Sequence, residues 1–352
     1  MNAPSESQAV SRISALLAEH LGLKPKLIRG KEREHHADFV YSAGDWTFVV
    51  EYKRTASAGG VAAAAKLLQQ ARAKNPKPVI PVVAVPFMGD LGREVCRKAS
   101  VCWMDLSGNA NLVGPGLRIV VTGRPNRFAG RGRPTNLFAP RSSRITRCLL
   151  LRPDEFQTQT EIARTARLDD GYVSKLVRRL KEEQLVIEND RGAIRARDPN
   201  LLLDAWSDAY QFEKHRIMKG HVSARSGEAL LDSLARKLER RRVAYAATGL
   251  GAAWLWTKFA GFRIVTIYLR EDPSDSLLGE LDFLGDEQGA NTWLVTPNDD
   301  GVFDGSTKLD DIDCVSALQA YLDLQAHPER AKEAAAAIRE RLLNWRAHAK
   351  ET

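Results

Sequence analysis

Residues 123–142, GRPNRFAGRGRPTNLFAPRS, contain three prolines and five arginines and show no apolar period. Proline and glycine interrupt helices and strands, so this stretch predicts a linker over residues 123–141. The chain on either side of it must therefore build separate hydrophobic cores. The 352 residues are also too many for one ordinary core, so two or three domains are expected. We predict an α/β multidomain protein.

Residues 1–122 alternate between helix patterns and strand patterns. The helices have apolar residues three or four positions apart, whereas the strands are short apolar or alternating runs. Helices are predicted near 8–21, 60–74 and 89–98, and strands at 37–42, 46–52, 78–85, 101–105 and 117–121. This alternation predicts an α/β sheet with helices on both of its faces.

Two of these predicted strands carry a pattern of nuclease type. Asp38 opens one strand, and Glu51-Tyr52-Lys53 closes the next. Because Glu51 and Lys53 are two residues apart, both point to one face of the strand. Asp38 and Glu51 offer the oxygen ligands that Mg²⁺ prefers, and Lys53 can orient a water or stabilise phosphate charge.

This pattern resembles the PD-(D/E)xK nuclease superfamily. The resemblance covers residues 8–121 and implies a restriction-endonuclease-like fold for residues 1–122. It also implies an Mg²⁺-dependent DNA endonuclease with Asp38, Glu51 and Lys53 as catalytic residues and with Asp38 and Glu51 as metal ligands. The alternative is that Glu51 and Lys53 form an ion pair on the exposed face of an edge strand.

A polar turn follows the predicted strand 101–105. It contains Asp105, Ser107 and Asn109 around Gly108. These side chains either line a functional cleft or cap a tight turn, as Asp and Asn commonly do beside glycine.

Positive charge is concentrated before residue 200. Residues 1–126 hold 17 Lys and Arg against 10 Asp and Glu, and residues 127–200 hold 16 against 10, whereas residues 201–352 hold 19 against 24. Basic surfaces attract DNA without reading its sequence. Arg131 and Arg133 of the linker resemble the AT-hook tripeptide, which places an arginine pair in an A·T minor groove. A solvated basic linker is the simpler interpretation.

Residues 142–199 are predicted to form a winged helix-turn-helix. A helix near 142–151 precedes Thr158 and Glu161, which have the spacing of a capping box at the start of a second helix. The third helix, 172–181, repeats apolar residues at the spacing of one buried face, and residues 185–196 form a hairpin. The order resembles the winged helices of bacterial transcription regulators.

The predicted contacts with double-stranded DNA lie on the exposed parts of this motif. The third helix would enter the major groove, the start of the second helix would meet a phosphate, and the hairpin tip would reach the adjacent minor groove or backbone. The residues are Thr158, Gln159, Thr160, Tyr172, Ser174, Lys175, Arg178, Arg179 and Arg191. The alternative is an ordinary solvated charged face. Such regulators usually bind palindromes, so a homodimer is expected, and DNA binding requires no cofactor.

Residues 200–352 are predicted to form a further α/β domain, with helices over 201–219 and 227–240 and strands at 244–247 and 263–269. The stretch 248–255, TGLGAAWL, resembles the opening of nucleotidyltransferase domains, where backbone N–H groups hold phosphates. The next strand lacks the acidic pair that binds metal in such domains. We expect a nucleotidyltransferase-like scaffold without transferase activity, in which small residues allow close packing of helix and strand.

The segments 314–324, CVSALQAYLDL, and 328–335, PERAKEAA, resemble the C-terminal region of AbiEi-type antitoxin regulators of type IV toxin–antitoxin systems. The resemblance covers about residues 142–345. It implies a DNA-binding transcription regulator and a cognate toxin, or another protein, as a partner of residues 200–352. The nuclease-like segment distinguishes this chain from the simplest members.

The remaining composition predicts a cytoplasmic protein. The four cysteines, Cys96, Cys102, Cys148 and Cys314, are scattered without a CxxC pair, as expected of buried thiols in a reducing compartment. Neither a run of 18 apolar residues nor a basic and then apolar N-terminus is present, so neither a membrane span nor a signal peptide is expected.

Overall fold

The computed structural model describes residues 4–28, 37–74, 79–128, 136–259, 261–286 and 288–345. The chain forms two compact units, Met1–Thr135 with Arg178–Leu185, and Asn136–Val177 with Val186–Thr352. The division at Thr135 falls inside the stretch predicted as a linker. Each unit contains a seven-stranded sheet, so the chain is a mixed α/β protein as expected.

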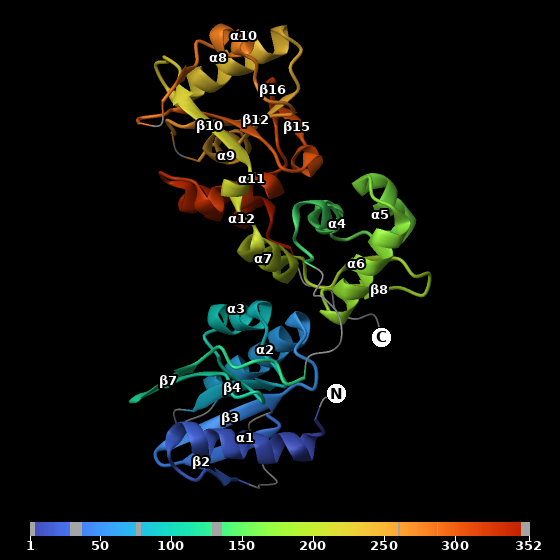
Figure 1. The fold of residues 1–352 in the computed structure, drawn as a ribbon, viewed down its shortest axis with the longest axis vertical. Coiled ribbons are helices and arrows are strands. Elements are labelled where there is room, and N and C mark those ends of the chain that lie inside the picture. The colour runs from blue at the N-terminus through green and yellow to red at the C-terminus, as the bar shows by residue number, and fades with distance from the viewer. Residues whose placement is uncertain are drawn as a thin grey trace. The chain divides into compact units, whose positions relative to one another are not determined.

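The first unit is a mixed sheet with helices on both faces. Its strand order is β1-β2-β3-β4-β5-β6-β7; β3, β4 and β5 are parallel to one another, and the outer pairs are antiparallel. Helix α1 covers one face, and α2 and α3 cover the other (Figure 1). The elements are α1 (Glu6–Leu21), β1 (Lys26–Leu27), β2 (Phe39–Ala43), β3 (Trp46–Tyr52), α2 (Ala58–Lys74), β4 (Ile80–Val85), α3 (Asp90–Lys98), β5 (Cys102–Asp105), β6 (Ala110–Gly114) and β7 (Leu117–Val121).

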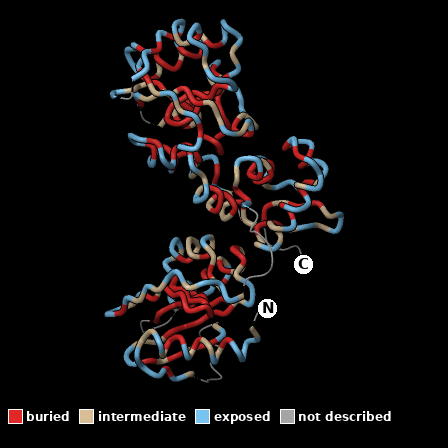
Figure 2. The backbone as a smooth tube through the Cα atoms, in the orientation of Figure 1, coloured by how far each residue is buried: buried red, intermediate tan, exposed pale blue. Residues whose placement is uncertain are grey.

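Strand β3 shows how the sequence produces these two layers. Phe48 and Val50 pack in the same core as Leu16 of α1, whereas Val49 packs with Leu68 of α2. Successive side chains of a strand point to opposite faces, so a strand buried on both sides is apolar throughout. Figure 2 shows the central strands of this sheet buried along most of their length.

Most elements predicted for residues 1–122 are confirmed to within two residues at each end. Strand β6 was not predicted. It pairs with β7 through a turn at Pro115-Gly116, where Gly116 has a φ of +68°. The segment of β6 follows directly on the polar turn 105–109 and has an irregular burial pattern. Its strand character depends on pairing with β5 and β7, which the local sequence does not reveal.

The second unit contains the winged-helix segment, apart from Arg178–Leu185 at the end of its third helix, and a second sheet. The sheet order is β13-β10-β14-β12-β11-β16-β15. The first elements are α4 (Pro140–Leu151), α5 (Gln159–Ala166), α6 (Asp170–Glu182), β8 (Val186–Glu188), β9 (Ile194–Ala196), α7 (Pro199–Ala209), η2 (Phe212–Lys214), β10 (Arg216–His221), α8 (Gly227–Arg240), β11 (Tyr245–Thr248) and α9 (Gly249–Thr257). The others are β12 (Val265–Leu269), α10 (Asp275–Glu280), β13 (Leu284–Gly285), β14 (Thr292–Thr296), η3 (Asp300–Phe303), β15 (Thr307–Leu309), β16 (Ile312–Cys314), α11 (Ala317–Asp323), η4 (Leu324–Ala326) and α12 (Ala331–Leu342).

The helix predicted over 201–219 is wrong beyond Ala209. Helix α7 ends there because Tyr210 takes an extended conformation, with φ −77° and ψ 139°. Residues Arg216–His221 form β10, which pairs antiparallel with β13 on one side and β14 on the other. Its backbone hydrogen bonds thus come from segments some 65 to 80 positions later, which a local apolar period cannot reveal.

The glycine-rich stretch 248–255 continues directly into a helix. Thr248 precedes α9, and Gly249 has a φ of +59°. Ala252 and Ala253 are fully buried, and a Cβ on Gly251 would lie 3.3 Å from Leu231 of α8. Small residues here permit close packing, in agreement with the interpretation as a packing motif. No helix in the described part of the chain is long and apolar enough to cross a membrane.

Candidate nucleic-acid interface

Helix α5 begins with the predicted capping box. The Thr158 hydroxyl accepts the Glu161 N–H at 3.2 Å, and the Glu161 carboxylate accepts the Thr158 N–H at 2.7 Å. This backbone N–H, together with the Thr158 hydroxyl, lowers the pKa of Glu161. The Thr158 side chain is therefore engaged within the helix cap. Of the three residues predicted to meet a phosphate, Gln159 is half-buried and Thr160 is exposed.

Helix α6 buries one face and exposes a basic one. Val173, Leu176 and Leu180 are each at most 1% exposed. Ser174, Lys175 and Arg178 are exposed, and residues 174 and 178 lie one turn apart on the same side of the helix. Within the described ranges, the Lys175 and Arg178 side chains form no ion pair or hydrogen bond. These two cations can therefore meet phosphates without giving up a partner.

The other two residues predicted on α6 have intramolecular partners. The Tyr172 hydroxyl lies 2.7 Å from the Ser142 hydroxyl, and the Arg141 guanidinium lies 5.3 Å from the Tyr172 ring centroid. Arg179 forms ion pairs with Glu182 at 3.1 Å and Glu183 at 2.6 Å. Tyr172 thus joins the start of α6 to α4, and the charge of Arg179 is largely compensated.

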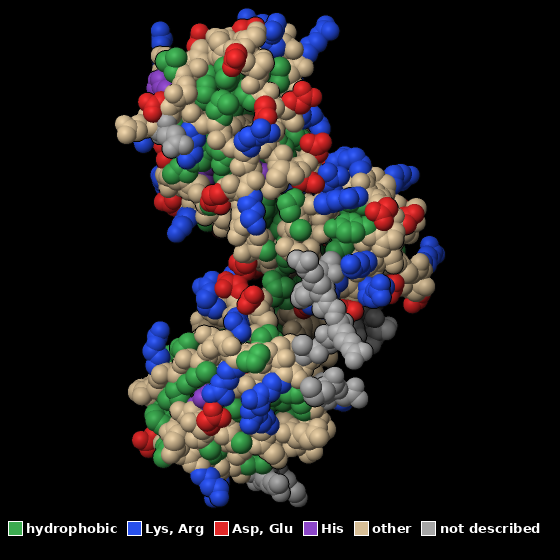
Figure 3. Space-filling view, viewed as in Figure 1, with side chains coloured by type: hydrophobic (Ala, Val, Ile, Leu, Met, Phe, Trp, Pro, Cys, Tyr) green, Lys and Arg blue, Asp and Glu red, His purple; other side chains and the backbone are tan. Residues whose placement is uncertain are grey.

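The wing presents Arg191 at its tip. The Asn189 side-chain oxygen accepts the backbone N–H groups of Arg191 and Ala193 at 3.1 and 3.0 Å, and Gly192 has a φ of +74°. These contacts fix the turn between β8 and β9, while the Arg191 side chain stays exposed. Lys and Arg side chains are numerous on the surface over α5, α6 and the wing (Figure 3). Arg131 and Arg133 lie outside the described residues.

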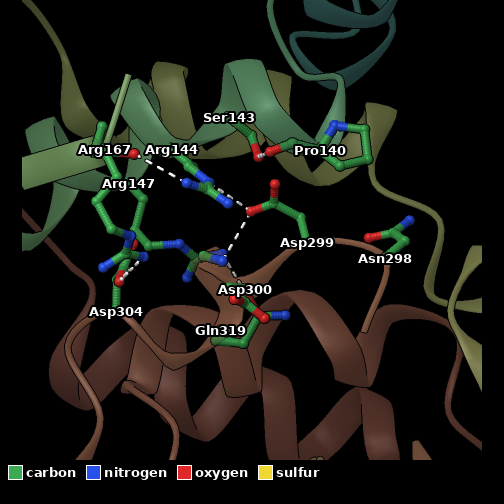
Figure 4. A network of polar contacts seen from close by, with 12 residues as sticks. Pro140, Ser143, Arg144, Arg147, Arg167, Asn298, Asp299, Asp300, Asp304 and Gln319 are labelled. Atoms are coloured by element: carbon green, nitrogen blue, oxygen red, sulfur yellow. Dashed lines mark hydrogen bonds and ion pairs between the residues drawn. The ribbon is translucent and has the colours of Figure 1, made fainter. Parts of the chain in front are cut away.

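Two ion pairs join this motif to the sheet of the second unit. Arg144 of α4 contacts Asp299 at 2.8 Å, and Arg167, at the end of α5, contacts Asp304 at 2.7 Å (Figure 4). The Arg144 guanidinium also donates to the Ala166 carbonyl at 3.1 Å. The pairing with Asp299 raises the pKa of Arg144. The sequence gives no signal for these contacts, because each pair is separated by more than 130 residues.

The nuclease-type residues of the first unit lie close together. Lys53 Nζ is 2.6 Å from Glu51 Oε1, as expected for residues on one face of a strand. The Asp38 carboxylate accepts the backbone N–H of Tyr52, between them, at 2.9 Å. Glu51 is 5% exposed and Asp38 is exposed. Over the ranges that the structure describes, no group of three His, Cys, Asp or Glu side chains is placed to hold a metal ion.

The polar turn after β5 is a closed hydrogen-bond cluster. The fully buried Asp105 carboxylate accepts the Met88 N–H at 3.2 Å and both the backbone and the side-chain N–H of Asn109 at 2.9 Å. Ser107 is also fully buried, and its hydroxyl accepts the Arg127 N–H at 3.3 Å. This agrees with the interpretation as a capped tight turn, because the buried Asp105 and Ser107 side chains accept N–H groups of the surrounding chain.

The four cysteines are buried free thiols, as expected. Burial raises the pKa of Cys96 and of Cys314 to about 12 and that of Cys148 to about 11. At neutral pH these sulfurs are protonated, and a thiol is a poor nucleophile and metal ligand.

Residues 195–344 match the AbiEi_2 family, which is described as transcriptional regulator, AbiEi antitoxin, type IV TA system. The matched region begins in β9 and continues past α12, and it covers less than half of the chain. It supports the C-terminal part of the resemblance expected over residues 142–345. The match does not include the nuclease-like segment, whose interpretation remains a prediction. The chain has no significant match among curated proteins or among solved structures.

Proposed function

We propose that this protein is a DNA-binding transcription regulator of AbiEi-antitoxin type that reads double-stranded DNA with α6 and the wing. The observation that carries the proposal is the exposed basic surface formed by Lys175 and Arg178 with Ser174 beside them, whose cations have no partner among the described residues. The family match of residues 195–344 supports a regulator with a C-terminal antitoxin-like region. Arg191 of the wing supplies a further cation at a position where winged helices contact DNA.

The predicted residues differ in whether their side chains are available to DNA or already engaged within the motif. Lys175 and Arg178 are the principal contacts, because a free guanidinium can hold a guanine edge or a phosphate in a bidentate manner. Tyr172, Thr158 and Arg179 act mainly within the motif, where they hold its helices or satisfy its charges. Gln159 and Thr160, the first two residues of α5, would meet a phosphate at the start of this helix.

The proposal is tested by fluorescence anisotropy with a labelled duplex from the region upstream of the protein's own gene. We expect Lys175→Ala/Arg178→Ala to bind this duplex roughly 10- to 100-fold more weakly and to show a smaller dependence of log K on log salt. The control is Arg225→Ala/Lys332→Ala, which removes the same charge from two exposed positions of the C-terminal region. Equal binding by all three proteins would refute the assignment of α6.

We propose two associations for this regulator. A homodimer would match a palindromic operator, and sedimentation equilibrium at micromolar concentration tests it. A cognate toxin would bind residues 200–352, as the antitoxin role of the matched family suggests. Co-expression with the product of the adjacent gene, followed by affinity purification, tests the second association, and a failure to co-purify after co-expression would contradict it.

A second candidate function is an Mg²⁺-dependent DNA endonuclease in the first unit. It is favoured by the contact of the Asp38 carboxylate with the backbone between Glu51 and Lys53, which gathers two carboxylates and a lysine. Two carboxylates with waters suffice for Mg²⁺, which would activate the attacking water and balance phosphate charge. Incubation of plasmid DNA with the protein and Mg²⁺ tests it. Cleavage must disappear in Glu51→Ala and persist in Glu94→Ala, a carboxylate of α3 that pairs with Arg97.

A further inference from the structure

A pocket of about 240 Å³ opens between the winged-helix motif and the sheet of the second unit. Its walls come from α4 and the residues before it, from the end of α7, and from the loop before η3. The apolar and aromatic part includes Phe138, Pro140, Trp206, Tyr210 and Val302. The polar part includes Arg147, Lys214 and His215. This combination of an apolar body and a few fixed polar groups is typical of small-molecule sites.

Arg147 is the unusual member of this pocket. It is 3% exposed, and its guanidinium lies 4.9 Å from the Trp206 ring centroid. Nη2 donates to the Gln319 side-chain oxygen at 2.5 Å, whereas Nε and Nη1 are buried and have no hydrogen-bond partner among the described residues. Burial lowers the pKa of Arg147. An arginine nevertheless keeps its proton, so the protein holds a charge that is only partly satisfied.

The neighbouring arginines have carboxylate partners of a kind that Arg147 does not have among the described residues. Arg144 and Arg167 face the same loop, and each has a carboxylate partner there, Asp299 and Asp304. Arg147 reaches instead across to the neutral amide of Gln319 (Figure 4). Arg144 and Arg167 thus each pair with a carboxylate, whereas Arg147 has no carboxylate partner in the part of the chain that the structure describes.

The nearby acidic groups are occupied elsewhere. The fully buried Asp323 carboxylate accepts bonds from Tyr210 at 2.5 Å, Tyr268 at 3.0 Å and Gln319 at 2.6 Å, and burial raises its pKa to about 6. Asp299 Oδ1 accepts both Arg144 Nε and the Gly301 N–H at 2.8 Å. Neither carboxylate contacts the guanidinium of Arg147.

The histidine in the pocket wall adds no charge near neutral pH. Burial lowers the pKa of His215 to about 4, and its Nδ1 accepts the Asn298 N–H at 3.1 Å. Lys214 adds a second positive charge to the lining, and the one carboxylate of the lining, Asp299, is paired with Arg144. The lining therefore keeps a positive charge that attracts an anion.

We propose that this pocket binds a small organic carboxylate with a flat apolar body. The guanidinium of Arg147 would donate a charge-assisted hydrogen bond to the carboxylate from one of its unused nitrogens, Nε or Nη1, and the ring would lie among Phe138, Trp206 and Tyr210. A cavity of about 150 Å³ can hold benzene, so 240 Å³ accommodates a ring with its carboxylate. Because Nε and Nη1 are shielded from water, the mouth of the pocket must open slightly as the ligand enters.

The ligand would connect α4 to the wall formed by α7 and the loop before η3, and so would strengthen the contact between the winged helix and the sheet beside it. The inference goes beyond DNA binding and does not depend on it, since the site and its ligand can be tested without DNA.

Isothermal titration of the full chain with sodium benzoate tests the site. We expect saturable 1:1 binding with a dissociation constant on the order of 0.1–1 mM, which is reasonable for a ligand of this size. Benzamide has the same shape without the charge and should bind at least 10-fold more weakly. Acetate has the charge without the ring and should also bind more weakly.

Three variants locate the binding. Arg147→Gln removes the guanidinium and should weaken benzoate binding at least 10-fold. Ala209→Trp should have the same effect by filling the mouth, because Ala209 is an exposed lining residue whose replacement leaves the core intact. Arg167→Gln is the control, since Arg167 belongs to the same group of arginines but does not line the pocket, and it should bind within about twofold of the wild type.

Three results would overturn the proposal. One is the absence of benzoate binding to the wild type up to roughly 20 mM. Another is equal binding of benzamide and benzoate, which would show that the charge has no role. The third is benzoate binding that survives in both Arg147→Gln and Ala209→Trp, which would place the ligand elsewhere. Because Ala209 is exposed, its variant keeps the test decisive even where Arg147→Gln fails to fold.

Discussion

The ion pair between Arg144 and Asp299 should be a main determinant of the stability of the second unit. The side chains of the pair are 15% and 13% exposed, with Nε and Oδ1 2.8 Å apart. Arg144 also donates to the Ala166 carbonyl, and Asp299 caps η3 through the Gly301 N–H. The perturbation is Arg144→Ala, which leaves the Asp299 carboxylate without its counter-ion in a poorly solvated position.

The expected loss in the free energy of unfolding follows from the burial of the pair. Breaking a buried ion pair by removing one partner costs about 3–5 kcal/mol, whereas exposed pairs contribute about 0–1 kcal/mol. The slight exposure of both side chains places Arg144→Ala near the lower end of the first range. We expect a loss of about 3 kcal/mol in the free energy of unfolding, of which the lost bond to the Ala166 carbonyl accounts for about 1 kcal/mol.

A double-mutant cycle with Asp299→Ala separates the pair from the other contacts. Asp299→Ala alone should cost more than Arg144→Ala, because it also removes the cap of η3. The coupling energy should be about 2 kcal/mol. Urea unfolding followed by tryptophan fluorescence is suitable, since five of the seven tryptophans lie in the second unit.

The control is Arg236→Ala, which breaks the exposed one-turn pair with Asp232 on α8 and should cost less than about 0.5 kcal/mol. A coupling energy below about 0.5 kcal/mol for Arg144 and Asp299 would show that the pair is solvated in solution. The reasoning that the pair of Arg144 and Asp299 stabilises the second unit would then be wrong.

Three other perturbations probe separate parts of the chain. The folded pKa of Asp323 lies above its unfolded value, so its contribution to stability is present at low pH and is lost as pH rises from about 4 through about 6. Asp323→Asn should remove this pH dependence. The difference in free energy of unfolding between wild type and variant, measured by urea titration, should change by about 3 kcal/mol between pH 4 and 6. A difference that stays constant with pH would contradict the raised pKa of Asp323. Thr158→Ala should lower the free energy of unfolding by about 1 kcal/mol through loss of the α5 cap. Thr160→Ala changes a threonine two residues further along that does not form the cap, and it should cost clearly less in the same assay. Asp105→Ala should destabilise the first unit by about 3 kcal/mol or more, because three buried N–H groups lose their acceptor, and an unchanged unfolding midpoint would exclude that account.

Elements whose causes are local could be predicted from the sequence. The capping box of α5, the apolar stripe of α6 and the bounds of α8 depend on residues within one or two turns of each other. The same is true of the pairing of Glu51 with Lys53, because alternation along a strand places them on one face. Which residues of α6 are exposed was likewise predictable in outline, since a helix with one apolar face exposes the other.

The environment of individual polar groups depends instead on how distant segments of the chain pack together. Strand β10 is a strand because β13 and β14 flank it, although the preceding helical pattern suggested a longer helix. Arg147 and Arg178 look alike in their local sequence, as basic residues of helices in one motif. One is buried with unsatisfied N–H groups and the other is exposed. Solvation and pairing of a charge are set by segments distant along the chain, here more than 150 residues away, and local sequence does not contain that information.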